Sequence, residues 1–324
     1  MRAAVCPQYG PPEVVEVTDL PAPVPEPGQV CVRVSVAAVN FPDVLLVADQ
    51  YQVTVPVPFI VGSEFAGVVT ELGHDATGFA VGDRVTGALM YGAFAEQVCV
   101  PAAALAPIPA GVDNAAAAAG GVAFRTAYHC LRSMARVGAG DEVVVLGAGG
   151  GVGLAAVALA GALGARVTAI ASSTEKLDAA TRHGAAVTIN YRDTDLRSAL
   201  KQAVPGGATA VIDPVGGDLS EPALRALRRG GRFVTVGYAS GTIARIPLNL
   251  VLVKGIHVLG FQFQDVPADE FRRNEAELRQ LLTSGRVRPH IGARYPLSEV
   301  VTALRQVADG SATGKVLVDV AVPV

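Results

Sequence analysis

Short apolar runs rich in valine, separated by proline and glycine, fill the first third of the chain. Residues 30–39 and 65–72 are two of these runs, and the turns at residues 25–28 and 81–83 lie between others. Short β-branched runs bounded by turn residues are typical of strands. The pattern therefore predicts a β-rich N-terminal domain.

Helical patterns follow at residues 115–119 and 126–134, and from residue 143 strands and helices alternate. This alternation predicts an α/β fold with a doubly wound, parallel six-stranded sheet and crossover helices. The predicted strands are residues 143–146, 167–171, 187–190, 210–212, 233–236 and 257–259, and the predicted helices between them are 153–163, 174–183, 196–203 and 219–228.

In the last part of the chain, the pattern of apolar and polar residues predicts an amphipathic helix at residues 269–283, a second helix at 298–308 and a strand at 315–320. We expect this tail to fold back onto the first domain. A length of 324 residues suits about two domains. The predicted boundaries are 1–120 with 262–324 for the β-rich domain, and 121–261 for the α/β domain.

The amino-acid composition excludes several classes of function. With 51% hydrophobic and 17% charged residues the chain is not disordered, and a net charge of −3 without a visible basic cluster argues against nucleic-acid partners. The cysteines have no metal-ligand spacing, so we expect four isolated buried thiols rather than a disulfide framework or a zinc module. They are Cys6, Cys31, Cys99 and Cys130.

The uncharged stretch of residues 143–165 is long enough to span a bilayer. Its internal order, however, is a β-branched run, five glycines and a helix-forming run, which predicts strand, turn and helix in a buried core. The first ten residues lack the apolar core of a secretory signal. No membrane partner and a cytoplasmic location are therefore expected.

The glycine-rich turn at residues 147–153 carries the strongest chemical signal. It follows a buried strand, opens a helix, and fits the spacing Gly147-x-x-Gly150-x-x-Gly153. Glycines in this setting let the backbone approach a pyrophosphate, and the helix N-terminus offers unpaired N–H groups. A Rossmann dinucleotide site is predicted, with Gly149, Gly150, Gly151 and Val152 at the cofactor.

The second strand ends in Ser172, where an NAD site usually has an acidic residue, and Lys176 follows on the next helix. A hydroxyl and an ammonium suit a 2′-phosphate, so NADP(H) is predicted over NAD(H). Residues 172–174 also suit a helix N-cap, and both roles can hold at once.

Several motifs resemble those of the medium-chain dehydrogenase/reductase superfamily, specifically its zinc-independent quinone oxidoreductase (zeta-crystallin-like) branch. The resemblance covers nearly the whole chain and implies a GroES-like catalytic domain beside the Rossmann domain. The matching segments are residues 40–43, 62–67, 81–85, 126–128, 147–153, 189–191, 213–217 and 313–317.

The resemblance also indicates whether the chain has a zinc site. Zinc-dependent relatives place Cys and His where this chain has Asn40 and Ser63, which are poor zinc ligands. No metal site is expected, and Glu64 is expected to pair locally. Without a Lewis acid, alcohol oxidation loses its usual means of stabilising an alkoxide, whereas reduction of a quinone or an activated C=C does not need one.

The resemblance further implies site residues. Asn40 and Tyr51 are the candidate catalytic residues, as proton donors or orienters, with water as the alternative donor. Relatives have Gln and a basic residue where this chain has Ala158 and Gly161, and a pocket tyrosine where it has Leu45, so substrate preference does not transfer. The implied cofactor contacts are Asn40, Thr126, Ser172, Lys176, Tyr191, Val215, Gly237, Phe261, Phe263 and Lys315.

Some of these roles have alternatives: Tyr191 is otherwise a packing aromatic, Lys315 a solvated charge and His129 a packed helical residue. The leading function is hydride transfer from NADPH to a quinone or an α,β-unsaturated carbonyl. The alternatives are a 2-enoyl-thioester reductase, with Arg272, Arg273 and Arg294 at a nucleotide tail, and a non-catalytic NADPH-binding protein. A homodimer is expected, formed through the apolar edge at residues 250–259.

Overall fold

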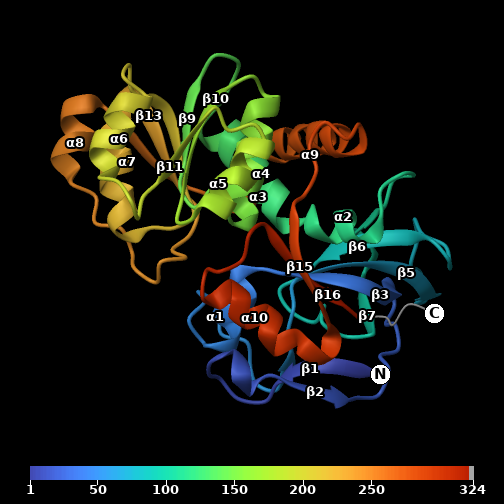
Figure 1. The fold of residues 1–324 in the computed structure, drawn as a ribbon. Helices are drawn as coiled ribbons and strands as arrows, with labels where there is room; N and C mark the ends of the chain where they lie inside the picture. The colour runs from blue at the N-terminus through green and yellow to red at the C-terminus, as the bar shows by residue number, and fades with distance from the viewer. Residues whose placement is uncertain (321–324) are drawn as a thin grey trace. The chain divides into compact units, whose positions relative to one another are not determined.

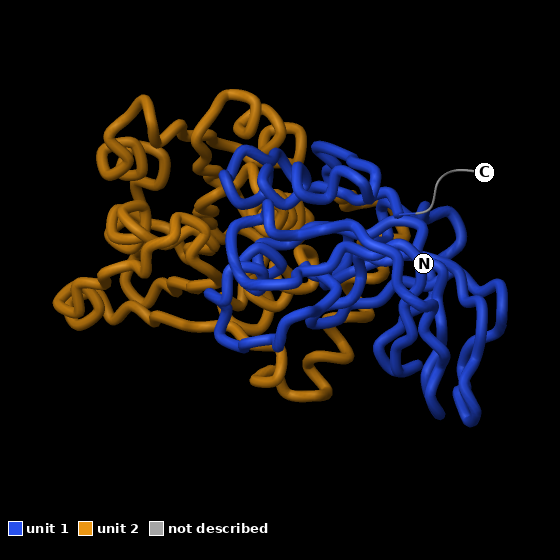
Figure 2. Tube along the Cα trace, turned by 90° about the horizontal axis from the view of Figure 1, so that it is seen from below, with its two compact units in different colours: residues 1–122, 290–324 blue, residues 123–289 orange. Residues whose placement is uncertain are grey.

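The computed structural model describes residues 1–320, and the chain folds into two compact units (Figure 2). Unit 1 contains Met1–Val122 and the chain from His290 onward, and unit 2 contains Ala123–Pro289. The predicted return to the first domain at residue 262 is wrong. Helix α9 (Ala268–Thr283) belongs to unit 2, because its apolar face packs into that unit's core, where Leu278 is buried.

Unit 2 contains the predicted parallel sheet, several strands of which are labelled in Figure 1. The strand order is β11-β10-β9-β12-β13-β14. Val143 and Val145 of β9 pack in one core and Val144 packs in another, so both faces of the sheet are buried. This explains why the strand appears as an uninterrupted apolar run. The strands are β9 (Glu142–Val145), β10 (Arg166–Ala171), β11 (Val187–Asn190), β12 (Ala208–Asp213), β13 (Leu227–Thr235) and β14 (His257–Gly260).

Helices connect these strands, and α4 lies within the core because its residues are apolar or glycine on every side. One helix was missed: within the apolar segment 250–259, expected as a sheet edge, only the end forms a strand. The helix before it ends at Gly255, which has a φ of 60°. The helices are α3 (Val122–His129), α4 (Gly151–Ala162), α5 (Thr174–Arg182), α6 (Leu196–Ala203), α7 (Ser220–Ala226) and α8 (Leu248–Lys254).

Unit 1 contains a seven-stranded sheet, ordered β15-β16-β3-β5-β6-β8 with β7 also paired to β3, and a three-stranded sheet ordered β2-β1-β4. The C-terminal strand β16 pairs antiparallel with β3, so Val316 lies opposite Val39 and the tail returns to this unit as predicted. The strands are β1 (Arg2–Cys6), β2 (Glu16–Asp19), β3 (Gln29–Val39), β4 (Phe59–Ile60), β5 (Glu64–Leu72), β6 (Arg84–Ala88), β7 (Gln97–Pro101), β8 (Leu105–Pro107), β15 (Ile291–Pro296) and β16 (Lys315–Asp319), and the helices are α1 (Phe41–Val47), α2 (Asn114–Ala119) and α10 (Val300–Ala308).

The expectation of four isolated cysteines is wrong for one pair. Cys31 of β3 lies opposite Cys99 of β7, and the two form a disulfide. Their separation of 68 residues along the chain hides this contact from sequence spacing. Cys6 and Cys130 are free and buried, as predicted.

Within residues 1–320, no helix combines the length and the apolar character needed to cross a membrane.

Candidate active site

The predicted cofactor residues of unit 2 follow the carboxyl ends of all six parallel strands. Because the strands are parallel, these residues lie at one edge of the sheet, and β9 marks the point where the strand order reverses. Thr126 lies apart from this set, half-buried on α3. The edge residues are Gly149, Gly150, Gly151 and Val152 after β9, Ser172 after β10, Tyr191 after β11, Val215 after β12, Gly237 after β13, and Phe261 and Phe263 after β14.

The turn between β9 and α4 can be formed only by glycine at two positions. Gly147 has a φ of 58°, and a Cβ on Gly153 would lie 2.1 Å from the carbonyl oxygen of Gly147. The start of α4 is therefore held tightly against the end of β9. Its first-turn N–H groups have no partner within the helix, which fits the binding of a pyrophosphate.

Lys176 lies directly over this turn. A Cβ on Gly149 would come within 2.4–2.8 Å of the Lys176 side-chain stem, so the absence of a side chain there makes room for the lysine. Ser173 is the N-cap of α5 and accepts a hydrogen bond from Lys176 N at 3.4 Å. Since Ser173 caps the helix, Ser172 is not needed for that role.

A second cation beside Lys176 was not predicted. Burial lowers the pKa of Lys176, and the charge of Arg192, which follows Tyr191, lowers it further. The ends of β10 and β11 thus bring two hydroxyl groups and two cations to one part of the edge. The signal for Arg192 was its position directly after the predicted tyrosine.

Asp213 organises the turn after β12. It is buried, and its Oδ1 accepts hydrogen bonds from Val215 N and Gly216 N at 2.8 Å each, while its Oδ2 accepts one from Ser220 Oγ at 2.5 Å. The turn places Val215 against the glycine turn, since a Cβ on Gly147 would lie 2.6 Å from Val215 Cγ2. Asp213 is thus a positioning residue that the motif contained but whose role the sequence did not show.

The aromatic residues after β14 are partly committed to packing. Phe261 and Phe263 contact the fully buried His129, with ring centroids 6.0 and 5.9 Å from the imidazole. His129 Nε2 lies 3.1 Å from Glu275 Oε1 of α9. The interpretation of His129 as a packed helical residue is confirmed.

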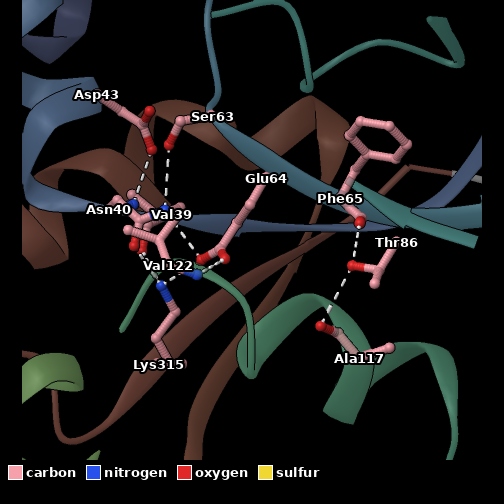
Figure 3. A network of polar contacts seen from close by, with 10 residues as sticks. All are labelled: Val39, Asn40, Asp43, Ser63, Glu64, Phe65, Thr86, Ala117, Val122 and Lys315. Carbon is pink, nitrogen blue, oxygen red and sulfur yellow. Dashed lines mark hydrogen bonds and ion pairs between the residues drawn. The ribbon is translucent and has the colours of Figure 1, made fainter. Parts of the chain in front are cut away.

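In unit 1, Asn40 stands at the junction of β3 and α1, within a buried polar cluster (Figure 3). Its Oδ1 accepts a hydrogen bond from Lys315 Nζ at 2.6 Å. Its Nδ2 donates to Glu64 Oε1 at 2.9 Å and to Ser63 Oγ at 3.1 Å. Both ends of the amide are therefore fixed, and the orientation of Asn40 is determined by its neighbours.

Lys315 is the cation of this cluster. Besides Asn40, its ammonium donates to Glu64 Oε1 at 2.7 Å and to Val39 O at 3.0 Å, so it has three acceptors. Glu64 Oε2 accepts from Val122 N at 2.6 Å. Local pairing of Glu64 is confirmed, whereas a contact between Lys315 and the cofactor stays a prediction.

The donor set around Asn40 does not fit a divalent metal. Asn40 and Ser63 are weak ligands, and the Lys315 ammonium already binds the oxygens of Asn40 and Glu64, where it would repel a second cation. In the described part of the chain, no three His, Cys, Asp or Glu residues gather as metal ligands.

Tyr51 lies in the loop after α1 and packs, half-buried, against the core of unit 1. Its catalytic role and that of Asn40 stay predictions.

Asp43 was missed by the sequence analysis. It is fully buried in α1, and its Oδ2 accepts a hydrogen bond from Asn40 N at 2.7 Å. Its Oδ1 has no hydrogen-bond partner among residues 1–320. Burial raises the pKa of Asp43 to about 7, despite the opposing effects of the Asn40 N–H, the Ser63 hydroxyl and the Lys315 charge.

The raised pKa of Asp43 predicts a specific pH dependence. Between pH 5 and pH 8 the folded chain must ionise a buried carboxyl that is already ionised when unfolded, which lowers the free energy of unfolding by about 2.5 kcal/mol. Asp43→Asn keeps the acceptor for Asn40 N and removes this titration. Denaturant unfolding is measured at pH 5 and pH 8. Relative to the parent, the free energy of unfolding of the variant should rise by about 2.5 kcal/mol between these two pH values.

The matched control is Asp83→Asn, since Asp83 also accepts from a backbone N–H three residues earlier but is exposed. It should leave the pH dependence unchanged. An equal pH dependence in the parent and Asp43→Asn would show that Asp43 is ionised throughout this range.

Two family descriptions match the chain. Residues 26–110 match the alcohol dehydrogenase GroES-like domain, and residues 151–281 match zinc-binding dehydrogenase. These segments lie in unit 1 and unit 2, respectively.

Known proteins of similar sequence and structure carry related names. Quinone oxidoreductase-like protein 2 of Bos taurus is 39% identical over 323 residues, covering 98% of this chain and 91% of that protein. Quinone oxidoreductase of Homo sapiens is 32% identical, covering 98% and 97%. The structure of Escherichia coli quinone oxidoreductase complexed with NADPH matches with a TM-score of 0.92 and 27% identity, covering 99% of this chain and 100% of that one.

Proposed function

Because the chain belongs to the medium-chain dehydrogenase/reductase superfamily, in its quinone oxidoreductase branch, we propose that it transfers a hydride from NADPH to a quinone or an α,β-unsaturated carbonyl. The observation that carries this proposal is the cluster around Asn40. The Asn40 amide contacts the ammonium of Lys315, the carboxylate of Glu64 and the hydroxyl of Ser63. This is not a set of metal ligands, because the ammonium occupies the place of a cation. This arrangement suits an acceptor that needs positioning and a proton, not a Lewis acid.

The choice of NADPH rests on the edge of the sheet in unit 2. Lys176 and Arg192 supply positive charge beside the glycine turn, and Ser172 and Tyr191 supply hydroxyl groups. A 2′-phosphate favours such charge-assisted contacts, whereas an NAD site has an acidic residue at the end of the second strand. The Escherichia coli quinone oxidoreductase and the mycobacterial Rv1454c are described as NADPH complexes, which agrees with this choice.

In the proposed reaction, NADPH supplies two electrons and one proton as a hydride, which the β-carbon of an enone or the quinone receives. One further proton completes the reduction, at the α-carbon or at the hydroquinone oxygen. Tyr51 and Asn40 are proposed to donate or orient at this step, with solvent as the final source of the proton. Lys315 and Glu64 hold the Asn40 amide in one orientation.

The thioester alternative loses support from the side chains it would need. Arg294 forms an ion pair with Asp319 at 2.5 Å, and Arg272 pairs with Asp269 one turn earlier on α9. Two of the three arginines are thus engaged in local ion pairs.

A panel of acceptors tests the proposal. NADPH oxidation is measured at fixed NADPH with a naphthoquinone, a simple enone and crotonyl-CoA. We expect saturable turnover with the quinone or the enone. Turnover of crotonyl-CoA alone would favour the thioester reductase, and cofactor binding without turnover of any acceptor would favour a non-catalytic protein.

We further propose a homodimer formed through the end of the sheet. Helix α8 and strand β14 expose large apolar side chains, with Leu248 76%, Leu252 84%, Val253 63% and Val258 42% accessible. Strand β14 is an edge strand, and such an edge is commonly covered by a second copy. A cytoplasmic location stays a prediction.

The dimer proposal predicts that Leu252→Arg shifts the protein to a monomer at micromolar concentration, because a charge would be buried at the interface. Light scattering after size exclusion measures the mass directly. Val24→Arg is the control, since Val24 is 78% exposed in unit 1. A parent protein that is already monomeric would contradict the proposal.

A further inference from the structure

A further feature of unit 2 lies at the ends of the strands opposite the predicted cofactor edge. A cavity of about 500 Å³ opens where β12 and β13 begin, next to Gly207 and Leu227. We call it the basic pocket, because none of its lining residues carries a carboxylate while six carry positive charge. The six are Arg197, Lys201, Arg225, Arg228, Arg229 and Lys254.

Three helices and the start of β13, which carries Arg228 and Arg229, bring these residues together. Arg197, Lys201 and Val204 are spaced by one and two turns along α6 and its C-cap, so they share one face. Arg225 comes from the last turn of α7, and Lys254 from the end of α8. Figure 1 shows α6, α7 and α8 on the same side of unit 2. A basic cluster was not predicted from the sequence, where three of these cations lie together at residues 225–229 and the other three at residues 197, 201 and 254.

Some of the six cations have structural roles. Lys254 Nζ donates to Arg225 O at 2.6 Å and Leu227 O at 2.8 Å, which satisfies carbonyls at the end of α7. Arg225 pairs with Glu221 at 2.6 Å, and Arg229 donates to Val253 O at 2.7 Å. These contacts give three of the six cations of the basic pocket a structural role.

Among the described residues, the other three cations form a weak ion pair or no ion pair. Arg228 reaches Asp141 only at 3.9 Å. Arg197 and Lys201 have no carboxylate within 4.0 Å among residues 1–320, although Arg197 is near enough to its neighbour Asp195 to lower the pKa of that carboxyl. Arg197 also lies in the first turn of α6, where the helix dipole disfavours a cation. A favourable interaction with the end of α6 therefore does not account for the presence of Arg197.

We propose that the basic pocket binds a small multivalent oxyanion of the polyphosphate class. Guanidinium and ammonium groups bind phosphate oxygens through charge-assisted hydrogen bonds, and several such groups favour an anion with more than one charge. The volume is in the range of small-molecule sites. No aromatic side chain lines the pocket, so the phosphate chain, and not a stacked base, is the group recognised.

Calorimetric titration of the whole protein with inorganic tripolyphosphate tests this inference. NADP⁺ is kept saturating so that phosphate sites at the cofactor edge are filled, and the titration is repeated with Lys176→Ala. We expect one tripolyphosphate per chain, with an affinity that falls as salt is raised. A parallel titration with ADP identifies the kind of ligand. Tighter binding of ADP than of tripolyphosphate indicates a nucleoside polyphosphate, and weaker binding of ADP indicates an inorganic polyphosphate.

The decisive variant is Arg197→Gln with Lys201→Gln, since both side chains are exposed and its fold can be checked by circular dichroism. We expect affinity to fall at least about tenfold. The matched control, Arg182→Gln with Arg279→Gln, removes two exposed helical cations elsewhere in unit 2 and should leave affinity unchanged. Absence of binding to the parent, equal affinity in both double variants, or loss of binding in Lys176→Ala would overturn the proposal.

Discussion

Replacing Lys315 by methionine is expected to lower the free energy of unfolding by about 3–5 kcal/mol. Lys315 and Glu64 are both almost fully buried, with side-chain exposures of 4% and 1%, and their charges meet at 2.7 Å. Methionine fills a similar volume but leaves the Glu64 carboxylate buried without its cation. It also frees the Asn40 Oδ1, so the orientation of the amide is no longer determined.

A second variant separates the charge from the packing. In Lys315→Met with Glu64→Gln, no unpaired charge stays buried, and most of the lost stability should return. The control is Arg294→Met on the neighbouring strand β15, whose pair with Asp319 is partly exposed and should contribute under about 1 kcal/mol. Denaturant unfolding followed by circular dichroism measures all three. A loss in Lys315→Met no larger than in Arg294→Met would contradict the account of the cluster.

Removing the two cations beside the glycine turn is expected to abolish the preference for NADPH. Lys176→Ala with Arg192→Ala should lower the ratio of kcat/KM for NADPH to that for NADH by at least about a hundredfold, because each charge-assisted contact to a 2′-phosphate contributes about 1.5–3 kcal/mol. The value for NADH should change little, since NADH lacks this phosphate.

Two further variants make this result specific. Ser172→Ala removes a neutral hydroxyl and should lower the ratio less than the double variant. Arg182→Ala removes an exposed cation from the end of the same helix α5 and should leave the ratio unchanged. If the double variant kept the parent's ratio, the 2′-phosphate would not bind between β10 and β11.

The sequence was most informative where function follows from local order along the chain. Each strand of the parallel sheet is a short apolar run, and the residues directly after it lie at the carboxyl edge by geometry alone. This is why Gly149 and Ser172 could be placed in advance, whereas Val215 was implied by the family resemblance. Helix α8 was missed because a short apolar run can form either a strand or a helix, and packing decides between them.

Residues joined only by the tertiary fold could not be found this way. The disulfide between Cys31 and Cys99 depends on the pairing of two strands far apart in the chain. The pairing of Lys315 with Glu64 depends on the C-terminal strand returning beside β3. For the same reason α9 was assigned to the wrong domain, since its amphipathic pattern does not show which core it covers.

The proposed reduction of a quinone or an enone with NADPH and without a metal can be tested directly. The most direct measurement is NADPH oxidation with a naphthoquinone by protein dialysed against a strong chelator. We expect turnover that the chelator does not change and a higher kcat/KM for NADPH than for NADH. Turnover that disappears on chelation and returns with zinc would contradict it.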